Sequence, residues 1–157
     1  MFSKSQAEHQ WLEQMIGDWS FDHQCMGPDN ESSQSSGKMT CRTMGGLWLI
    51  CESSGGTSDE DKWSSIMTLG FDPTKNRYVG TFVGSMMANI WHYRGTVDES
   101  GKRLPLDSKG PKFGGAGTCL YRDTIEIVDA NEWLMISEMQ DDDGAWVKFM
   151  HGKHTRI

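Results

Sequence analysis

The chain opens with apolar residues at helical spacing and then changes to a period of two. The helical positions near the start are Trp11, Leu12, Met15 and Ile16. Ser5 and Glu8 have the spacing of a capping box, and Gly17 follows the last apolar position. This pattern predicts a short amphipathic helix over residues 6–16, the only substantial helix that the sequence indicates.

From Asp18 onward, apolar and polar residues alternate, and turn residues recur about every ten positions. Turns such as residues 72–76 (DPTKN) and 141–144 (DDDG) favour tight hairpins, because proline suits the second position of a type I turn and glycine accepts a positive φ. We therefore predict strands near residues 18–26, 36–44, 46–54, 62–72, 76–84, 89–98, 103–107, 117–128, 132–140 and 145–155.

Strands that follow one another without crossover helices cannot build a parallel sheet, so the sequence leaves a sandwich or an up-and-down barrel. Connections by hairpins alone favour the barrel. We predict an all-β fold for residues 1–157 as a single domain: an up-and-down antiparallel β-barrel of about ten strands with a short N-terminal helix. Such a barrel is wide enough to hold its own side chains and one small ligand.

The alternation also predicts which side chains face the barrel interior. In strand 18–26 these are Trp19, Phe21, His23 and Cys25. In strand 62–72 they are Trp63, Ser65, Met67, Leu69 and Phe71. In strand 132–140 they are Trp133, Met135 and Met139, because Glu132 and Glu138 mark the outer face. Strands 89–98 and 117–128 have apolar residues on both faces; there we assign Trp91 and Tyr93 to the interior, with Arg122 as a buried polar group.

Charge and composition limit the classes of partner that we expect for this protein. The 157 residues contain 15 basic and 22 acidic side chains, a net charge of -7, which disfavours nucleic acid and anionic membranes because both require a cationic surface. No apolar run has the length of a signal peptide or a membrane span, so we expect a cytoplasmic protein without membrane insertion. The spacing of Cys25, Cys41, Cys51 and Cys119 fits neither a redox pair nor a zinc site, which favours reduced thiols packed in strands.

A series of short motifs runs in order along nearly the whole chain. They are HQWL (residues 9–12), IGDW (16–19), LGFDP (69–73), YVG (78–80), WHYRG (91–95), YRD (121–123) and TR (155–156). The series resembles a family of uncharacterised bacterial proteins, a domain-of-unknown-function family whose members open with a helix and a Gly-x-Trp strand. The chain departs from that family's pattern at Arg94, where an acidic residue is expected, and at the Met86-Met87 pair.

The Gly17-x-Trp19 opening and Arg156 also resemble the calycin superfamily of lipocalins and fatty-acid-binding proteins. In that superfamily the Trp packs under the Arg at the closed end of the barrel. The resemblance implies structural roles for Gly17, Trp19 and Arg156, and it implies a fold and a cavity but no reaction. With Arg156 facing inward beside Trp19, the last strand is predicted to turn three more residues inward: His154, Met150 and Trp146.

The inward residues are rich in Met and Trp, and the flexible Met side chain adapts to an apolar guest. We therefore predict a pocket for a small hydrophobic or amphipathic molecule. Its predicted walls are Trp63, Met67, Trp91, Met135, Met139 and Met150, and its predicted polar anchors are Tyr93, Arg122 and His154. The alternative is that these residues fill the barrel as a solid core.

The sequence contains no motif for catalysis. It lacks a Gly-x-Ser-x-Gly elbow, and the glycine-rich segment 108–117 lacks the Gly-Lys-Ser/Thr ending of a phosphate loop. His151 and His154 lie three apart on a strand and so face opposite ways, which argues against a shared metal. We expect no cofactor and no metal. Two alternatives stay open: a haem-binding or enzymatic barrel that uses His23 or His154, and a filled barrel that forms a homodimer through a strand edge left by residues 108–117.

Overall fold

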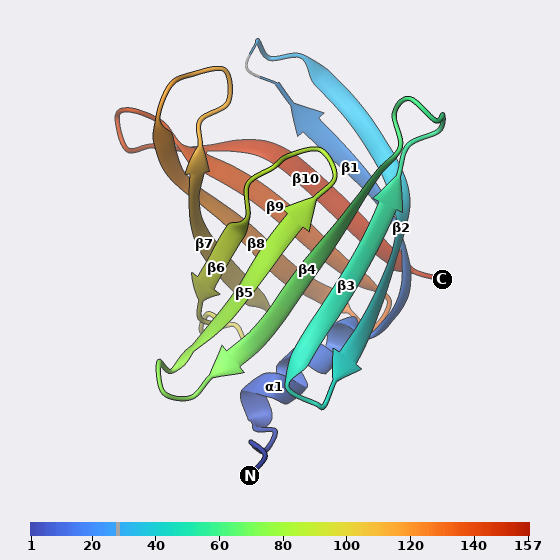
Figure 1. Ribbon diagram of the computed structural model, residues 1–157, viewed down its shortest axis with the longest axis vertical. Helices are drawn as coiled ribbons and strands as arrows, with labels where there is room; N and C mark the ends of the chain where they lie inside the picture. Colours follow the sequence, from blue (N-terminus) through green and yellow to red (C-terminus); the bar gives the residue numbers. More distant parts are fainter. Residues whose placement is uncertain (28) are drawn as a thin grey trace.

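In the computed structural model, which describes residues 1–27 and 29–157, ten antiparallel strands follow one another round a closed barrel, and β1 closes the ring on β10 (Figure 1). The strands are β1 (Gly17–Met26), β2 (Ser32–Met44), β3 (Trp48–Gly55), β4 (Trp63–Asp72), β5 (Arg77–Gly84), β6 (Trp91–Gly95), β7 (Arg103–Pro111), β8 (Thr118–Asp129), β9 (Glu132–Gln140) and β10 (Trp146–Arg156). The predicted up-and-down barrel with a short N-terminal helix is confirmed. Within the described residues, no helix is long and apolar enough to cross a membrane.

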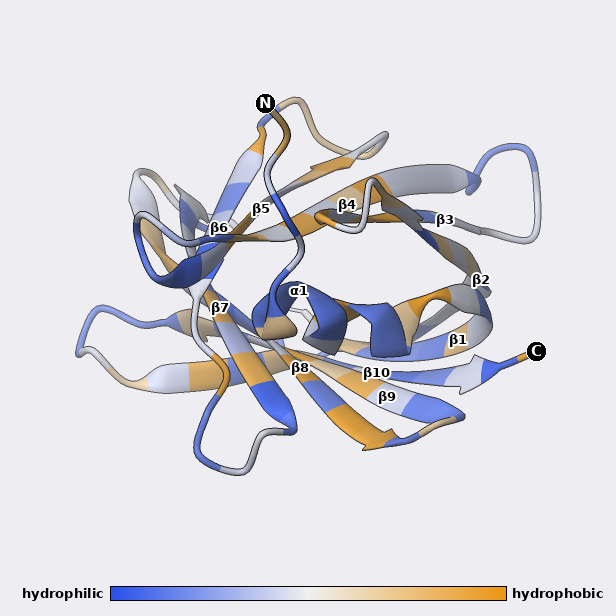
Figure 2. Ribbon diagram, turned by 90° about the horizontal axis from the view of Figure 1, so that it is seen from below, coloured by the Kyte–Doolittle hydropathy of each residue, from blue (hydrophilic) through white to orange (hydrophobic). Residues whose placement is uncertain are grey.

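The predicted helix is present as α1 (Ala7–Leu12) and a 3-10 turn (Glu13–Met15), and it lies across one end of the barrel (Figure 2). The prediction that Ser5 caps it is wrong. Gln6 is the N-cap, and its backbone N–H donates to Nδ1 of His9 over 3.0 Å. Nε2 of His9 lies 3.1 Å from the carbonyl oxygen of Phe71, so the same imidazole also ties α1 to β4.

The end of the barrel beneath α1 is a solid hydrophobic core. Its side chains come from strands all round the ring and are at most 1% exposed: Trp19, Leu69, Leu104, Leu106, Ile125 and Trp133. Leu12 and Met15 from the helical segment pack against this core and close it. We call this half of the molecule the closed end and the opposite opening the mouth.

The predicted contact between Trp19 and Arg156 is confirmed at the closed end. The guanidinium carbon of Arg156 lies 4.2 Å from the centroid of the Trp19 ring. Arg156 also donates hydrogen bonds to the carbonyl oxygens of Gln14, Ile16 and Ala130. Gly17 has a φ of +131°, and a Cβ there would overlap Nη1 of Arg156, so glycine suits this position in both conformation and space.

Two features of the strands differ from the sequence expectations. β7 continues to Pro111, which pairs with Thr118 of β8, so the first part of the segment 108–117 belongs to a strand. β7 pairs with β6 at Leu106 and Asp107, and a homodimer through the segment 108–117 stays a prediction. In addition, β2 begins at Ser32, four residues before the predicted start of this strand at residue 36. The cysteines are free thiols in strands, as predicted.

Candidate functional site

The interior of the barrel changes in character between the closed end and the mouth. Five inward-facing side chains near the mouth are partly exposed: Trp63, Phe82, Trp91, Met139 and Met150. One step deeper on the same strands, Ser65, Tyr93 and Ser137 are buried. Because the exposed members of this series face the interior, water reaches into the barrel from the mouth and stops at the buried layer.

Eight of the nine side chains predicted to bind a ligand face this interior. Met67, Tyr93, Met135 and His154 are buried in the deeper layers, whereas Trp63, Trp91, Met139 and Met150 lie at the mouth. The predicted pocket therefore spans two different environments. Only its mouth half is in contact with solvent, and Met67 and Met135 belong to the packed core.

The prediction that Arg122 faces the interior is wrong. Its neighbours Tyr121 and Asp123 face inward, so Arg122 lies on the outer surface, where its Nε donates to Asp107 over 2.7 Å. The alternation of Ile125 and Ile127 with Glu126 carried this information, since it assigns the odd-numbered residues of β8 to the interior.

The inward prediction for Trp146 is wrong as well. A β-bulge between Lys148 and Met150 shifts the register of β10, so Trp146 pairs with outward-facing Gln140. Its ring lies on the outer surface, 4.3 Å from the guanidinium carbon of Arg122.

A polar cluster of three residues forms the floor beneath the mouth: Tyr93 on β6, Asp123 on β8 and Ser137 on β9. The Tyr93 hydroxyl donates to Oδ2 of Asp123, and the Ser137 hydroxyl also hydrogen-bonds to this carboxylate. Burial raises the pKa of Asp123, and these two hydrogen bonds oppose that shift. Burial and the neighbouring carboxylate together raise the pKa of Tyr93 well above its ordinary value. Asp123 and Ser137 were not predicted from the sequence as site residues.

Four aromatic rings gather on the mouth side of this floor, and we call them the mouth aromatic cluster: Trp91, Phe113, Tyr121 and Phe149. The ring centroids of Trp91 and Tyr121 are 4.8 Å apart, and Phe113 lies 5.6 Å from Tyr121 and 5.1 Å from Phe149. Tyr121 donates its hydroxyl to the carbonyl oxygen of Pro111. The glycine-rich segment thus brings Phe113 over the mouth, and the β10 bulge brings Phe149 to the same cluster.

Two imidazoles, His23 on β1 and His154 on β10, stack on aromatic rings inside the barrel. His154 lies 3.6 Å from the Trp133 ring with an angle of 7° between the planes, and the two imidazole centroids are 5.5 Å apart. Burial lowers the pKa of His154 to about 3, with a further contribution from His23, and lowers the pKa of His23 to about 4. Both rings are therefore neutral at pH 7.

The hydrogen-bonding capacity of these imidazoles is not fully used. Nδ1 of His154 and Nε2 of His23 are buried and have no hydrogen-bond partner. His151 is exposed on the opposite face from His154, as predicted. In the part of the chain that the structure describes, no three His, Cys, Asp or Glu side chains are grouped to hold a metal ion. A neutral imidazole with a free nitrogen is also the form that ligates haem iron, so the haem alternative stays a prediction.

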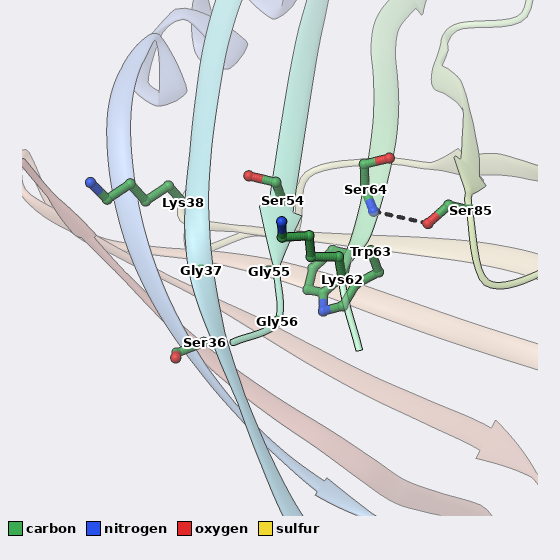
Figure 3. Close-up of a pocket in the computed structure, with 10 residues that line it drawn as sticks. All are labelled: Ser36, Gly37, Lys38, Ser54, Gly55, Gly56, Lys62, Trp63, Ser64 and Ser85. Carbon is green, nitrogen blue, oxygen red and sulfur yellow. Dashed lines mark hydrogen bonds between the residues drawn. The ribbon is translucent and has the colours of Figure 1, made fainter. Parts of the chain in front are cut away.

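A separate pocket of about 680 Å³ lies at the rim, over β2, β3 and β4 (Figure 3). The side chains of Lys38, Ser54 and Ser64 line it from the outer face, because Met39, Ser53 and Ser65 beside them are the residues that face inward. The remaining lining residues are Ser36, Gly37, Gly55, Gly56, Lys62, Trp63 and Ser85. The Lys62 ammonium pairs with Asp59 over 2.5 Å, and none of the lining residues has a buried polar atom without a partner. This is an open groove lined mainly by serine, glycine and lysine, together with Trp63, and it was not predicted from the sequence.

Comparison with known proteins agrees with this architecture. The solved structure of Rv2717c from M. tuberculosis superimposes with a TM-score of 0.68 at 11% identity, covering 98% of this chain and 99% of that one. The S-type phycobiliprotein lyase CPES from Guillardia theta gives a TM-score of 0.60 at 13% identity, covering 94% and 91%. At such identities the likeness concerns the barrel fold alone. A search of curated proteins finds no match. A family model described as "Protein of unknown function (DUF1579)" matches residues 4–156, and the chain therefore belongs to the DUF1579 family.

Proposed function

We propose that this protein binds a small apolar or amphipathic molecule non-covalently in the mouth half of its barrel. The observation that carries the proposal is the change in exposure along the interior. Trp63, Trp91 and Met139 face inward and are partly exposed, above a polar floor that contains buried Tyr93 and partly exposed Asp123.

Such a mouth favours an apolar guest for a simple physical reason. Each square ångström of apolar surface that a guest removes from water contributes roughly 25 cal/mol. The Met139 and Met150 side chains can change rotamer to fit the guest, whereas the aromatic rings offer rigid faces. The polar floor would set which end of an amphipathic guest enters first.

Titration with a neutral fluorescent probe, N-phenyl-1-naphthylamine, tests this function. We expect saturable binding to the wild-type protein. Met139→Trp adds a larger ring at the mouth and should raise the Kd of the probe by about tenfold or more. The cost in unfolding free energy should stay within ~1 kcal/mol, because the Met139 side chain is partly exposed. The matched control is Gln140→Trp, which adds the same ring to the outer face of the same strand and should leave the Kd nearly unchanged.

The alternative of a filled barrel makes the opposite prediction. In a solid core the added ring overpacks the interior, and Met139→Trp should cost about 1 to 3 kcal/mol of unfolding free energy. The wild-type protein would then show no saturable probe binding. Probe titration and a urea midpoint, measured on the same three proteins, therefore decide between the two functions.

A further inference from the structure

The charges that face the interior are few and unevenly placed. Among the inward-facing positions of the strands that the structure describes, the charged side chains are Asp123 and Arg156. Arg156 lies at the closed end, where Trp19 and three backbone carbonyls occupy its guanidinium. The imidazoles of His23 and His154 are neutral at pH 7. Asp123 therefore faces the interior below the mouth without a basic partner.

The surroundings of Asp123 stabilise its carboxylate only in part. A carboxylate offers about four acceptor positions, and the hydroxyls of Tyr93 and Ser137 use two of them. The other groups beside it are apolar or uncharged: Leu106 pairs with Asp123 on β7, and Met150 pairs with Ser137 on β10. An interior carboxylate in such a setting gains most from a cation that also donates a hydrogen bond.

The mouth aromatic cluster adds a second feature that attracts cations. The ring of Tyr121 lies two residues before Asp123 on β8, and Trp91 lies two residues before Tyr93 on β6, so both rings are one layer nearer the mouth than the polar floor. The faces of aromatic rings carry partial negative charge and attract ammonium and guanidinium groups. The same ring faces and the Asp123 carboxylate would repel an anionic group. The chain's net charge of -7 also favours a cationic ligand over an anionic one.

We propose that the ligand of the mouth is an amphipathic organic cation, whose ammonium or amidinium group pairs with Asp123 beside Tyr93 and whose apolar part packs against Trp91, Met139 and Met150. This assignment rests on the proposed function, since it names the class of molecule that the mouth binds. It identifies Asp123 as the residue that determines specificity and the mouth aromatic cluster as the path along which the cation enters.

Competition between three ligands of equal length tests the assignment: decylamine, decanol and decanoate, each below its micelle concentration at pH 7. Each is titrated as a competitor against N-phenyl-1-naphthylamine bound to the protein. We expect protonated decylamine to bind about tenfold or more tightly than decanol, and decanoate to bind most weakly. Decanoate binding as well as decylamine would overturn the assignment.

Two variants identify the responsible carboxylate. Asp123→Asn keeps the shape and should remove the preference of decylamine over decanol, while the Kd of decanol changes less than about twofold. Glu138→Gln removes a charge from the outer face of the adjacent β9 and should keep the full preference. A preference that survives in Asp123→Asn, or that disappears in Glu138→Gln, would assign the effect to the overall surface charge and contradict the proposal.

Further outcomes distinguish a failure of the cation assignment from a failure of the proposed function. If Asp123→Asn does not fold, Tyr93→Phe serves instead, because it retains the carboxylate and removes a competing donor; the preference for decylamine should then be kept or increased, and its loss would contradict the proposal. If decanol and the naphthylamine probe bind and decylamine gains nothing, only the cation assignment fails. If none of these molecules binds, the proposed function itself fails.

Discussion

The two buried imidazoles connect the stability of this protein to pH. An unfolded histidine has a pKa near 6.5, whereas burial lowers the pKa of His23 to about 4 and that of His154 to about 3. Between these values the unfolded chain binds more protons than the folded one, so the unfolding free energy decreases as the pH falls below about 6.5. We expect each histidine to contribute a loss of about 1 to 2 kcal/mol between pH 7.5 and pH 5.

Urea unfolding at the two pH values measures this effect, and variants separate the histidines from other groups. The raised pKa of Asp123 acts in the opposite direction, so the informative quantity is the difference between wild type and variant. His154→Phe can retain the stack on Trp133 and should reduce the pH dependence by the contribution of one histidine. His151→Gln, on the exposed face of the same strand, should leave it unchanged. Equal pH dependence in wild type and His154→Phe would contradict this account.

Individual residues differ in how well the sequence predicted their direction in the barrel. Trp19 and Trp63 face the interior as their alternating strands predicted, and so does Tyr93. His154 also faces the interior, as the resemblance at Arg156 implied. Arg122 was misassigned since Tyr121, Arg122 and Asp123 place polar and aromatic groups on both faces. Asp123 was overlooked because an acidic residue next to a basic one is typical of a solvated strand face, although the alternation of Ile125 and Ile127 assigns it to the interior. Its pairing with Ser137 and its hydrogen bond with Tyr93 place its carboxylate inside the barrel.

At the level of elements, Arg156 joins four segments at the closed end. It links β10 to the 3-10 turn and the β1 entry through Gln14 and Ile16, and to the β8–β9 turn through Ala130. Arg156→Met removes these hydrogen bonds and the charge above Trp19, and we expect it to lower the unfolding free energy by about 2 to 4 kcal/mol. Arg156→Lys should recover only part of the loss, because an ammonium group lacks the planar fork of donors.

A lysine on the same strand provides the control for this measurement. Lys153 forms an exposed ion pair with Glu132 at 3.3 Å. Lys153→Met should therefore change the unfolding free energy, measured by urea unfolding, by less than about 1 kcal/mol. An Arg156→Met protein as stable as Lys153→Met would show that the closed end does not depend on the arginine.

The elements were predictable to different degrees for physical reasons. Strands such as β4 and β9 alternate between large apolar and polar residues, so their bounds lie within a residue or so of the prediction. The first half of β2 contains mainly serines, and alternation carries no information when both faces are polar. The bulge between Lys148 and Met150 has no local marker in the sequence, yet it reverses the direction of Trp146 and brings Phe149 to the mouth.

At the scale of the whole molecule, dense packing and the proposed binding site are separated along the barrel axis. The ring is closed, so every strand has two hydrogen-bonded neighbours. Side-chain packing is dense at the end covered by α1, whereas the mouth strands are held by backbone hydrogen bonds with partly exposed side chains inside. The mouth can therefore tolerate changes in its lining that the closed end cannot.

Truncations at the two ends measure this separation. Leu69→Ala and Leu104→Ala remove side chains that are fully buried in the closed-end core and should each cost about 2 to 5 kcal/mol of unfolding free energy. Met139→Ala and Met150→Ala remove partly exposed interior side chains and should each cost less than about 1.5 kcal/mol, because they leave no sealed cavity. Urea midpoints give the four values under one condition. Losses of equal size at both ends would mean that the interior is packed throughout, and the mouth would then have no space for a guest.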